Sequence, residues 1–227
     1  MEYRLIGNTV PAVEMTLNSG ESIFTQSGGM VWQSEGIEMQ TNTKGGLMKG
    51  LGRMLAGDSL FMNTYQAKRD NATIAFASTV PGKIVPVVLD KSHPGLIAQK
   101  GAFLCAETGV ELNVTLTKKL GAGLFGGEGF VLQDISGVGT AFLEIDGDIV
   151  EKELQNGETL LVDTGNVVAF DKTCKYEVTT VKGAKNIIFG GEGLFLTKLV
   201  GPGKVILQTQ NFNDFAHKIL SLMPKSN

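Results

Sequence analysis

Glycine punctuates this chain at a spacing that limits the choice of fold more than any other feature. Thirty glycines are spread over the 227 residues and separate runs of about four to eight residues, the usual length of short strands joined by tight turns. Inside the runs apolar and polar residues alternate, most clearly in residues 110–116, as they do in a strand with one buried and one wet face. The pattern predicts an all-β protein.

The glycine pattern also recurs along the chain. Residues 127–130 (Gly-Glu-Gly-Phe) resemble residues 191–195 (Gly-Glu-Gly-Leu-Phe), a weaker version lies at 57–61 (Gly-Asp-Ser-Leu-Phe), and a companion glycine precedes each of them. The markers start at Gly57, Gly127 and Gly191, and their companions are Gly28, Gly101 and Gly165. One copy of several strands cannot bury both faces alone, so we expect three degenerate copies, at about 1–80, 81–145 and 146–210, to pack with pseudo-threefold symmetry. The prediction is a single domain covering 1–227.

Two local patterns refine this picture. Gly137-Val138-Gly139 and Gly201-Pro202-Gly203 each lie between apolar runs and predict hairpin turns, with Asp70-Asn71 in that place in the first copy. Residues 212–223 predict a short C-terminal helix, capped by Asn213-Asp214 and ended before Pro224, because their apolar residues follow a three-and-four spacing. We expect this helix to dock on the β-body.

The first copy carries an insertion at residues 44–56 that is the candidate interaction segment. Its apolar residues share one helical face, although its glycines weaken a helix. Its cations would suit contact with anionic lipid, whereas its Met-rich face suits packing over the open end of the β-body or on a neighbouring subunit. The candidate residues are Leu47, Met48, Lys49, Leu51, Arg53, Met54 and Leu55.

Composition and charge narrow the functional classes. Twenty Lys and Arg against 23 Asp and Glu give a formal charge of −3, without the basic run expected of a nucleic-acid binder. No apolar stretch approaches about 18 residues and no signal-peptide pattern is present, so we expect a cytoplasmic protein. Cys105 and Cys174 lie in apolar runs and are expected to be buried, reduced thiols. Trp32, the single Trp, is expected in core packing or a subunit contact.

Residues suited to catalysis or metal binding are few. His93 and His217 have no nucleophile in a recognisable motif nearby, so we expect no catalytic residues, no cofactor and no metal. The recurring acidic set, Asp58, Glu128 and Glu192, would bind a cation or small ligand if the three carboxylates converged. The competing interpretation places each of them in a turn beside its glycine, as for Glu21 and Glu158.

Several ordered pieces of the chain resemble the mitochondrial-biogenesis family linked to altered inheritance of mitochondria. The pieces are residues 28–32, 36–39, 55–61, 81–84 and 126–130, and the resemblance covers nearly the whole chain. It implies a fold like that of the tryptophan RNA-binding attenuation protein, with repeated β-units around a pseudo-threefold axis. It implies no catalytic residues, and it associates a yeast relative with mitochondrial inner-membrane organisation.

Three functional hypotheses follow. The leading one is a non-enzymatic binding or scaffold protein that forms homo-oligomers, with a role in membrane organisation and a peripheral membrane contact kept open. The second is nucleic-acid binding by fold analogy, for which Lys118-Lys119 offers a small basic start. The third is the cation or small-ligand site formed by Asp58, Glu128 and Glu192.

Overall fold

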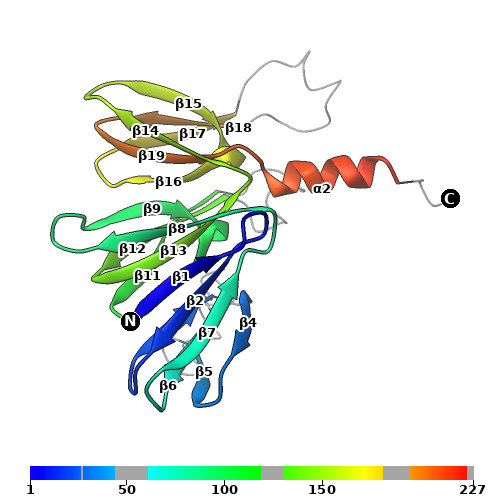
Figure 1. Cartoon of the computed structure of the whole chain (residues 1–227). Coiled ribbons are helices and arrows are strands. Elements are labelled where there is room, and N and C mark those ends of the chain that lie inside the picture. The colour runs from blue at the N-terminus through cyan, green and yellow to red at the C-terminus, as the bar shows by residue number, and fades with distance from the viewer. Residues whose placement is uncertain (27, 44–60, 119–129, 181–194, 224–227) are drawn as a thin grey trace. The chain divides into compact units, whose positions relative to one another are not determined.

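β-Strands make up most of the described part of the chain. The computed structural model describes residues 1–26, 28–43, 61–118, 130–180 and 195–223. These residues form antiparallel sheets, two short 3-10 turns and one α-helix near the C-terminus (Figure 1). The prediction of an all-β protein with a short C-terminal helix is confirmed.

The strands fall into three successive blocks of six. Strand β1 (Glu2–Ile6) precedes them. Block 1 contains β2 (Ala12–Leu17), β3 (Ser22–Thr25), β4 (Met30–Gln33), β5 (Ile37–Thr43), β6 (Phe61–Ala67) and β7 (Ala72–Ala77). Block 2 contains β8 (Gly82–Leu89), β9 (Gly95–Gln99), β10 (Phe103–Glu107), β11 (Val110–Lys118), β12 (Phe130–Gly137) and β13 (Gly139–Asp146). Block 3 contains β14 (Ile149–Leu154), β15 (Thr159–Asp163), β16 (Val167–Asp171), β17 (Lys175–Thr180), β18 (Phe195–Val200) and β19 (Gly203–Gln208).

Strand pairing repeats with a period of six strands. One six-stranded sheet has the order β5-β6-β3-β10-β13-β8, and the other has β11-β12-β9-β16-β19-β14, which is the same order with every number raised by six. The remaining sheets, β1-β2-β7-β4 and β15-β18-β17, contain the parts of this pattern that blocks 1 and 3 have left over. The division of the chain into three copies at about 1–80, 81–145 and 146–210 stays a prediction. The packing of three copies about one axis stays a prediction.

The chain folds into two compact units that do not coincide with the blocks. Unit 1 comprises residues 1–95, 101–114 and 135–145, and unit 2 comprises residues 96–100, 115–134 and 146–227. Most of β8, β10 and β13 therefore belongs to unit 1, whereas β9 and parts of β11 and β12 belong to unit 2. Each six-stranded sheet thus joins half of one block to half of the next.

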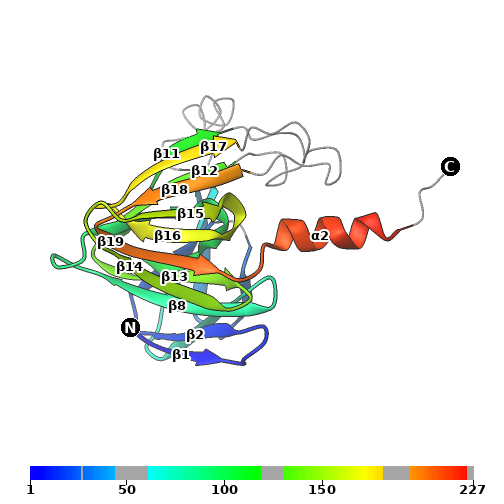
Figure 2. The same cartoon turned by 90° about the horizontal axis from the view of Figure 1, so that it is seen from above.

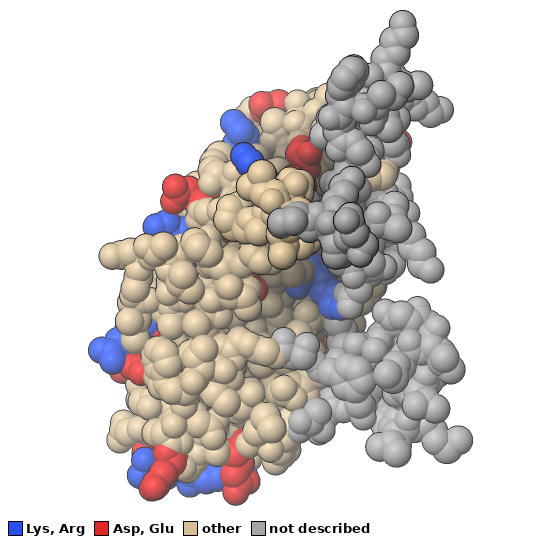
Figure 3. Space-filling model, turned by 90° about the vertical axis from the view of Figure 1, so that its right-hand side faces the viewer, with Lys and Arg blue, Asp and Glu red and all other residues tan. Residues whose placement is uncertain are grey.

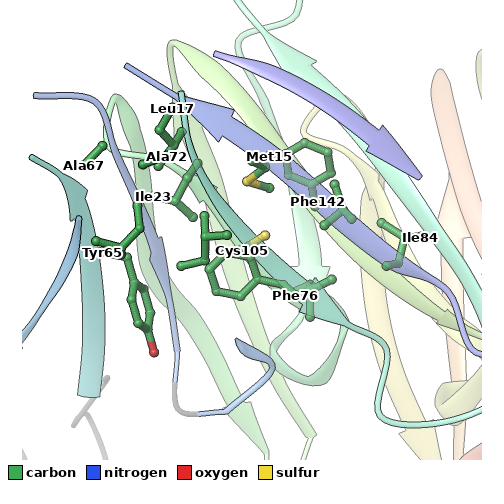
Figure 4. Close-up of a cluster of buried hydrophobic side chains, with 14 residues drawn as sticks. Met15, Leu17, Ile23, Tyr65, Ala67, Ala72, Phe76, Ile84, Cys105 and Phe142 are labelled. Carbon is green, nitrogen blue, oxygen red and sulfur yellow. The ribbon is translucent and has the colours of Figure 1, made fainter. Parts of the chain in front are cut away.

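Each unit has its own hydrophobic core. In unit 1 the buried side chains include Ile23, Tyr65, Phe76 and Phe142, which converge from several strands in Figure 4. The rings of Tyr65 and Phe76 meet edge to face with centroids 5.8 Å apart. The core of unit 2 is formed by another set of buried side chains, among them Phe130, Leu132, Phe170 and Leu199. Burial of such side chains stabilises each by about 1.5–3 kcal/mol relative to exposure.

Equivalent cross-strand pairs exchange large and small side chains between blocks. The third strand of each block pairs with the sixth, and each pairing contains a register shift at the same place. Directly after the shift, one partner is larger than the other. In blocks 2 and 3 both partners are buried, so the pair rather than the single residue fills the space there. These pairs are Trp32 with Ala75, Cys105 with Phe142, and Ala169 with Ile206. This exchange explains why the copies look degenerate in sequence.

The predicted Gly-x-Gly hairpins are wrong. Gly137-Val138-Gly139 connects β12 to β13, and these two strands belong to different sheets; β18 and β19 are separated in the same way. Gly139 and Gly203 have φ values of +139° and +143°, which L side chains rarely adopt. Glycine here permits a sharp corner that carries the chain from one sheet into the next, whereas a hairpin would have kept both strands together.

Helix α2 (Phe212–Ser221) differs from its prediction in two respects. Its N-cap is Asn211 rather than Asn213-Asp214, since the Asn211 Oδ1 accepts a hydrogen bond of 3.0 Å from the Asn213 N–H. Its apolar side is not docked on the strands: Phe215 is 47% and Leu220 61% exposed. Figures 1 and 2 both show α2 extending away from the strands of its own unit.

Candidate functional site

The residues that the sequence singled out for function lie outside the described residues. This applies to the whole candidate interaction segment, namely Leu47, Met48, Lys49, Leu51, Arg53, Met54 and Leu55, and to the acidic set Asp58, Glu128 and Glu192. The side chain of His217 and the whole of Lys119 are also outside them. The cation-site hypothesis and its turn alternative for that acidic set therefore both stay predictions.

Carboxylates in the described part of the chain hold its corners together. The Glu107 carboxylate accepts a 2.6 Å hydrogen bond from the Thr140 N–H, and the Asp171 carboxylate accepts one of 2.8 Å from the Lys204 N–H. These two acids occupy the same position in blocks 2 and 3, directly after the strand pair with the register shift. In block 1 that position is Ser34, whose hydroxyl accepts from the N–H of residue 73 at 2.8 Å. All three groups have a structural task.

The other predicted turn acids are confirmed as parts of turns. Glu21 accepts a 2.8 Å hydrogen bond from the Asn18 N–H, and Glu158 accepts one of the same length from the Gln155 N–H. The Asn18 hydrogen bond, followed by the Met1 ammonium, holds the pKa of Glu21 below its ordinary value. At Gly20-Glu21 and Gly157-Glu158 the pair is therefore a turn signature, since the carboxylate closes the turn on its own backbone.

The two cysteines are confirmed as buried and unpaired. Cys105 is fully buried in β10 and Cys174 is 5% exposed. Burial raises the pKa of both thiols, and for Cys174 the nearby carboxylates of Asp171 and Glu153 add to the effect. Thiols with raised pKa values are poor nucleophiles and poor metal ligands at neutral pH. Among the described residues, no three His, Cys, Asp or Glu side chains gather as a metal site would require.

Several surface cations in the described part of the chain form ion pairs with nearby acids. Arg4 contacts Glu14 at 2.6 Å and Lys68 contacts Glu38 at 3.2 Å. Figure 3 shows acidic and basic side chains next to one another at the lower end of the face that it displays. Mixed charges of this kind attract a phosphate backbone less than a run of one sign does.

Helix α2 carries a row of exposed apolar side chains, which we call the apolar stripe of α2. We use this name for the following residues, which are 44–61% exposed: Phe212, Phe215, Ile219 and Leu220. The helix is anchored at its first turn, where the Phe212 N–H donates a 3.0 Å hydrogen bond to the Asp146 carboxylate. Burial raises the pKa of Asp146, and the Phe212 hydrogen bond opposes that shift. The sequence predicted the apolar stripe correctly. It also predicted that the helix docks on the strands, and in the described part of unit 2 the stripe stays exposed instead.

Two sheet edges expose further apolar side chains that sequence reasoning missed. In β4, Val31 is 50% and Trp32 44% exposed, and in β15 Leu161 is 60% exposed. Trp32 is thus not a core residue, as one of its two predicted roles required; its indole N–H donates a 3.0 Å hydrogen bond to Glu14 instead. The signal in β15 was its unbroken run Leu160-Leu161-Val162, because alternation would have placed a polar residue on an exposed face.

No described helix is long and apolar enough to cross a membrane.

The model of the family described as mitochondrial biogenesis AIM24 matches residues 3–210. An uncharacterised protein of Streptococcus pyogenes serotype M6 is 30% identical over 224 residues, which cover 95% of this chain and 88% of that protein. The crystal structure of a structural-genomics target from Streptococcus pyogenes has a TM-score of 0.80 and 26% identity, covering 98% of this chain and 99% of that one. The chain therefore belongs to the mitochondrial biogenesis AIM24 family, as the resemblance predicted.

Proposed function

We propose that this protein is a non-enzymatic binding or scaffold protein that self-associates. The observation that carries the proposal is the apolar stripe of α2. A helix of ten residues is marginal in water, and its stability in a folded protein comes from burying an amphipathic face. Here that face is exposed along its length in the described chain. A partner that covers it would supply the missing burial.

The charges on α2 favour a protein partner over a lipid surface. Helices that lie on anionic membranes carry several Lys or Arg on the polar face. In α2 the basic contribution comes from Lys218, and Asp214 in the first turn offsets it. We therefore take a second copy of this chain as the partner, and vesicle binding as the competing outcome.

The non-enzymatic part of the proposal is supported by the tasks of the described acids. Glu21 and Glu158 close turns, while Glu107 and Asp171 hold the corners. Groups committed to backbone hydrogen bonds in this way are not poised for proton transfer to a substrate.

Sedimentation velocity of the full chain at about 1 to 100 μM tests the proposal. We expect a species heavier than one chain whose population rises with concentration. Phe215→Asp should weaken association by roughly tenfold or more, because a charge would be buried at an apolar contact. Asn213→Asp, which adds the same charge to the same helix, should leave it nearly unchanged.

A strict monomer throughout this range would overturn the proposal. Co-flotation with phosphatidylglycerol vesicles that Phe215→Asp abolishes would replace it with a peripheral membrane role. Binding to single-stranded RNA that weakens with salt would replace it with the nucleic-acid hypothesis.

A further inference from the structure

Two strands of this chain leave open an edge that their counterparts in other blocks have paired. The second strand of one block pairs antiparallel with the third strand of the next: β3 with β10, and β9 with β16. β15 is the second strand of the last block, and β4 is the third strand of the first. In the described part of the chain, both lie at the edge of their sheets.

The other sheet edges do not break the repeat in this way. The fourth strands of the blocks, β5, β11 and β17, each end a sheet, so an open edge there belongs to the pattern. The first strands β8 and β14 also end a sheet, and β2 is covered by β1. Only at β4 and β15 do the described residues lack a pairing that the equivalent strands possess.

Burial follows this difference. Leu161 in β15 is 60% exposed, whereas the equivalent Phe24 and Ile97 are 7% and 8% exposed. Val31 in β4 is 50% exposed, whereas the equivalent Leu104 and Val168 are 3% and 1% exposed. The two edges therefore expose the apolar side chains that the completed junctions bury, and exposed edges of this kind pair with other strands.

We propose that β15 of one copy pairs antiparallel with β4 of a second copy, repeating between chains the junction that β3–β10 and β9–β16 form within one. The proposal rests on the self-association proposed above and adds a second contact between copies to that of the apolar stripe of α2. In the register of β9–β16, Leu161 lies opposite Gln33 and Val162 lies opposite Trp32. Each copy offers one edge of each kind, so the assembly is head to tail and forms a ring or a filament. The predicted pseudo-threefold packing would close the same junction within one chain instead, and the experiment below separates the two arrangements.

Both halves of the junction carry their matching local features, which favours a second copy over a foreign peptide. β4 has the same register shift, between Met30 and Trp32, that β10 and β16 have. β15 follows a turn closed by Glu158, as β3 follows a turn closed by Glu21. β15 therefore has the same local features as β3, the strand that pairs with β10. Because β10 is the counterpart of β4, β15 is suited to pair with β4.

Disulfide trapping between two singly substituted proteins tests the proposal. Gln33→Cys and Leu161→Cys are purified separately, mixed and oxidised with diamide; residues opposite one another in a sheet are within disulfide range. Cys105 and Cys174 are buried and should not react. We expect a cross-linked dimer in the mixture that neither protein forms alone. A protein carrying both substitutions should give a ladder of covalent multimers.

The outcomes separate this proposal from the one on which it rests. Oligomers without the cross-link would overturn the β15–β4 junction and leave self-association standing. A monomer in sedimentation would overturn both. A doubly substituted protein that closes its disulfide within one chain, while the mixture gives none, would also overturn the junction between copies.

A charge on the edge provides a second measurement. Leu161→Lys should weaken association by roughly tenfold or more, since lysine on an edge strand opposes strand addition. Val138→Lys is the matched control, because Val138 is 66% exposed in a corner and is not part of either edge. Equal association of the two variants would contradict the proposal.

Discussion

The two compact units contain six-stranded sheets of identical strand order, yet they fill and close those sheets with different residues. At the cross-strand pair that follows the register shift, unit 1 has Cys105 with Phe142, and unit 2 has Ala169 with Ile206. At the corner beside it, unit 1 uses Glu107 and unit 2 uses Asp171. The comparison teaches that both units repeat the same backbone pairing and the same hydrogen-bonding positions. The sizes of the side chains that fill the core differ between the units.

The largest expected effect comes from the cross-strand pair. Phe142→Ala should destabilise the protein by about 3–5 kcal/mol, because it leaves a cavity in the core of unit 1 and removes the ring contact with Tyr3 at 5.0 Å. Ile206→Ala should cost about 2–5 kcal/mol but less than Phe142→Ala, since a smaller group is removed. Urea unfolding followed by far-UV circular dichroism measures both. Losses below about 1 kcal/mol would show that pair volume does not govern these cores.

Glycine at the corners gives the next largest effect. Gly203→Ala should destabilise by about 1–3 kcal/mol and more than Gly139→Ala. Both have positive φ, but a Cβ at Gly203 would meet the Thr173 hydroxyl at 2.6 Å, whereas one at Gly139 would meet Glu107 at 3.1 Å. Block 1 has Ala72 at this position, so Ala72→Gly is the matched control and should cost about 1 kcal/mol or less. Thermal unfolding that ranks Gly139→Ala as the more harmful change would contradict this account.

Loss of a corner hydrogen bond should cost more stability where the acceptor is a carboxylate than where it is a hydroxyl. Glu107→Ala and Asp171→Ala should each cost about 1–3 kcal/mol, since a charged acceptor is lost from a backbone N–H, and Ser34→Ala about 0.5–1.5 kcal/mol. Asp171→Asn keeps an acceptor oxygen and should recover part of the loss. Chemical denaturation at neutral pH measures the series. A Ser34→Ala effect as large as the other two would show that the three corners are not equivalent.

The smallest expected effects concern pH, and the two units should respond with opposite sign. Hydrogen bonds from Trp32 and Arg4 hold the pKa of Glu14 below its ordinary 4.5, so its stabilisation is present above that pH and is lost as pH falls through the lowered pKa. The pKa of Asp146 is raised above its ordinary 3.8, chiefly by burial, so stability falls as pH rises from 3.8 through the raised value.

Melting temperatures between about pH 3 and 7 measure these two contributions. Glu14→Gln should flatten the loss of stability on acidification. Asp146→Asn should remove the loss on raising the pH while keeping an acceptor for the Phe212 N–H. Identical pH profiles for both variants would contradict the assigned directions.

Much of the fold was predictable because strands and their turns have recognisable local sequence patterns. Alternation in residues 110–116 and the Gly-Glu turns before β3 and β15 follow from backbone geometry alone. The sheet to which a strand belongs does not. Gly137-Val138-Gly139 has the composition of a hairpin, but its neighbouring strands enter different sheets, because pairing depends on partners far along the chain.

The interaction surface was less predictable for a related reason. Val31 and Trp32 have the same apolar character as Leu104 and Cys105, so nothing in the local sequence distinguishes an exposed edge from a buried junction. The difference arises because, among the described strands, β4 has no partner on its outer edge, whereas β10 and β16 have one. The helix stripe was recognisable from its spacing, whereas its exposure depends on what the rest of the unit leaves uncovered.

The division of block 2 between the two units bears on how the number of blocks in such a protein could increase or decrease. Every junction between successive blocks joins the same two kinds of strand, so a copy added to or removed from the middle would meet neighbours that it already fits. A single excised copy, by contrast, would contain two half-sheets and no complete one. The element that this architecture repeats is therefore the junction between blocks, and a single block does not contain a whole one.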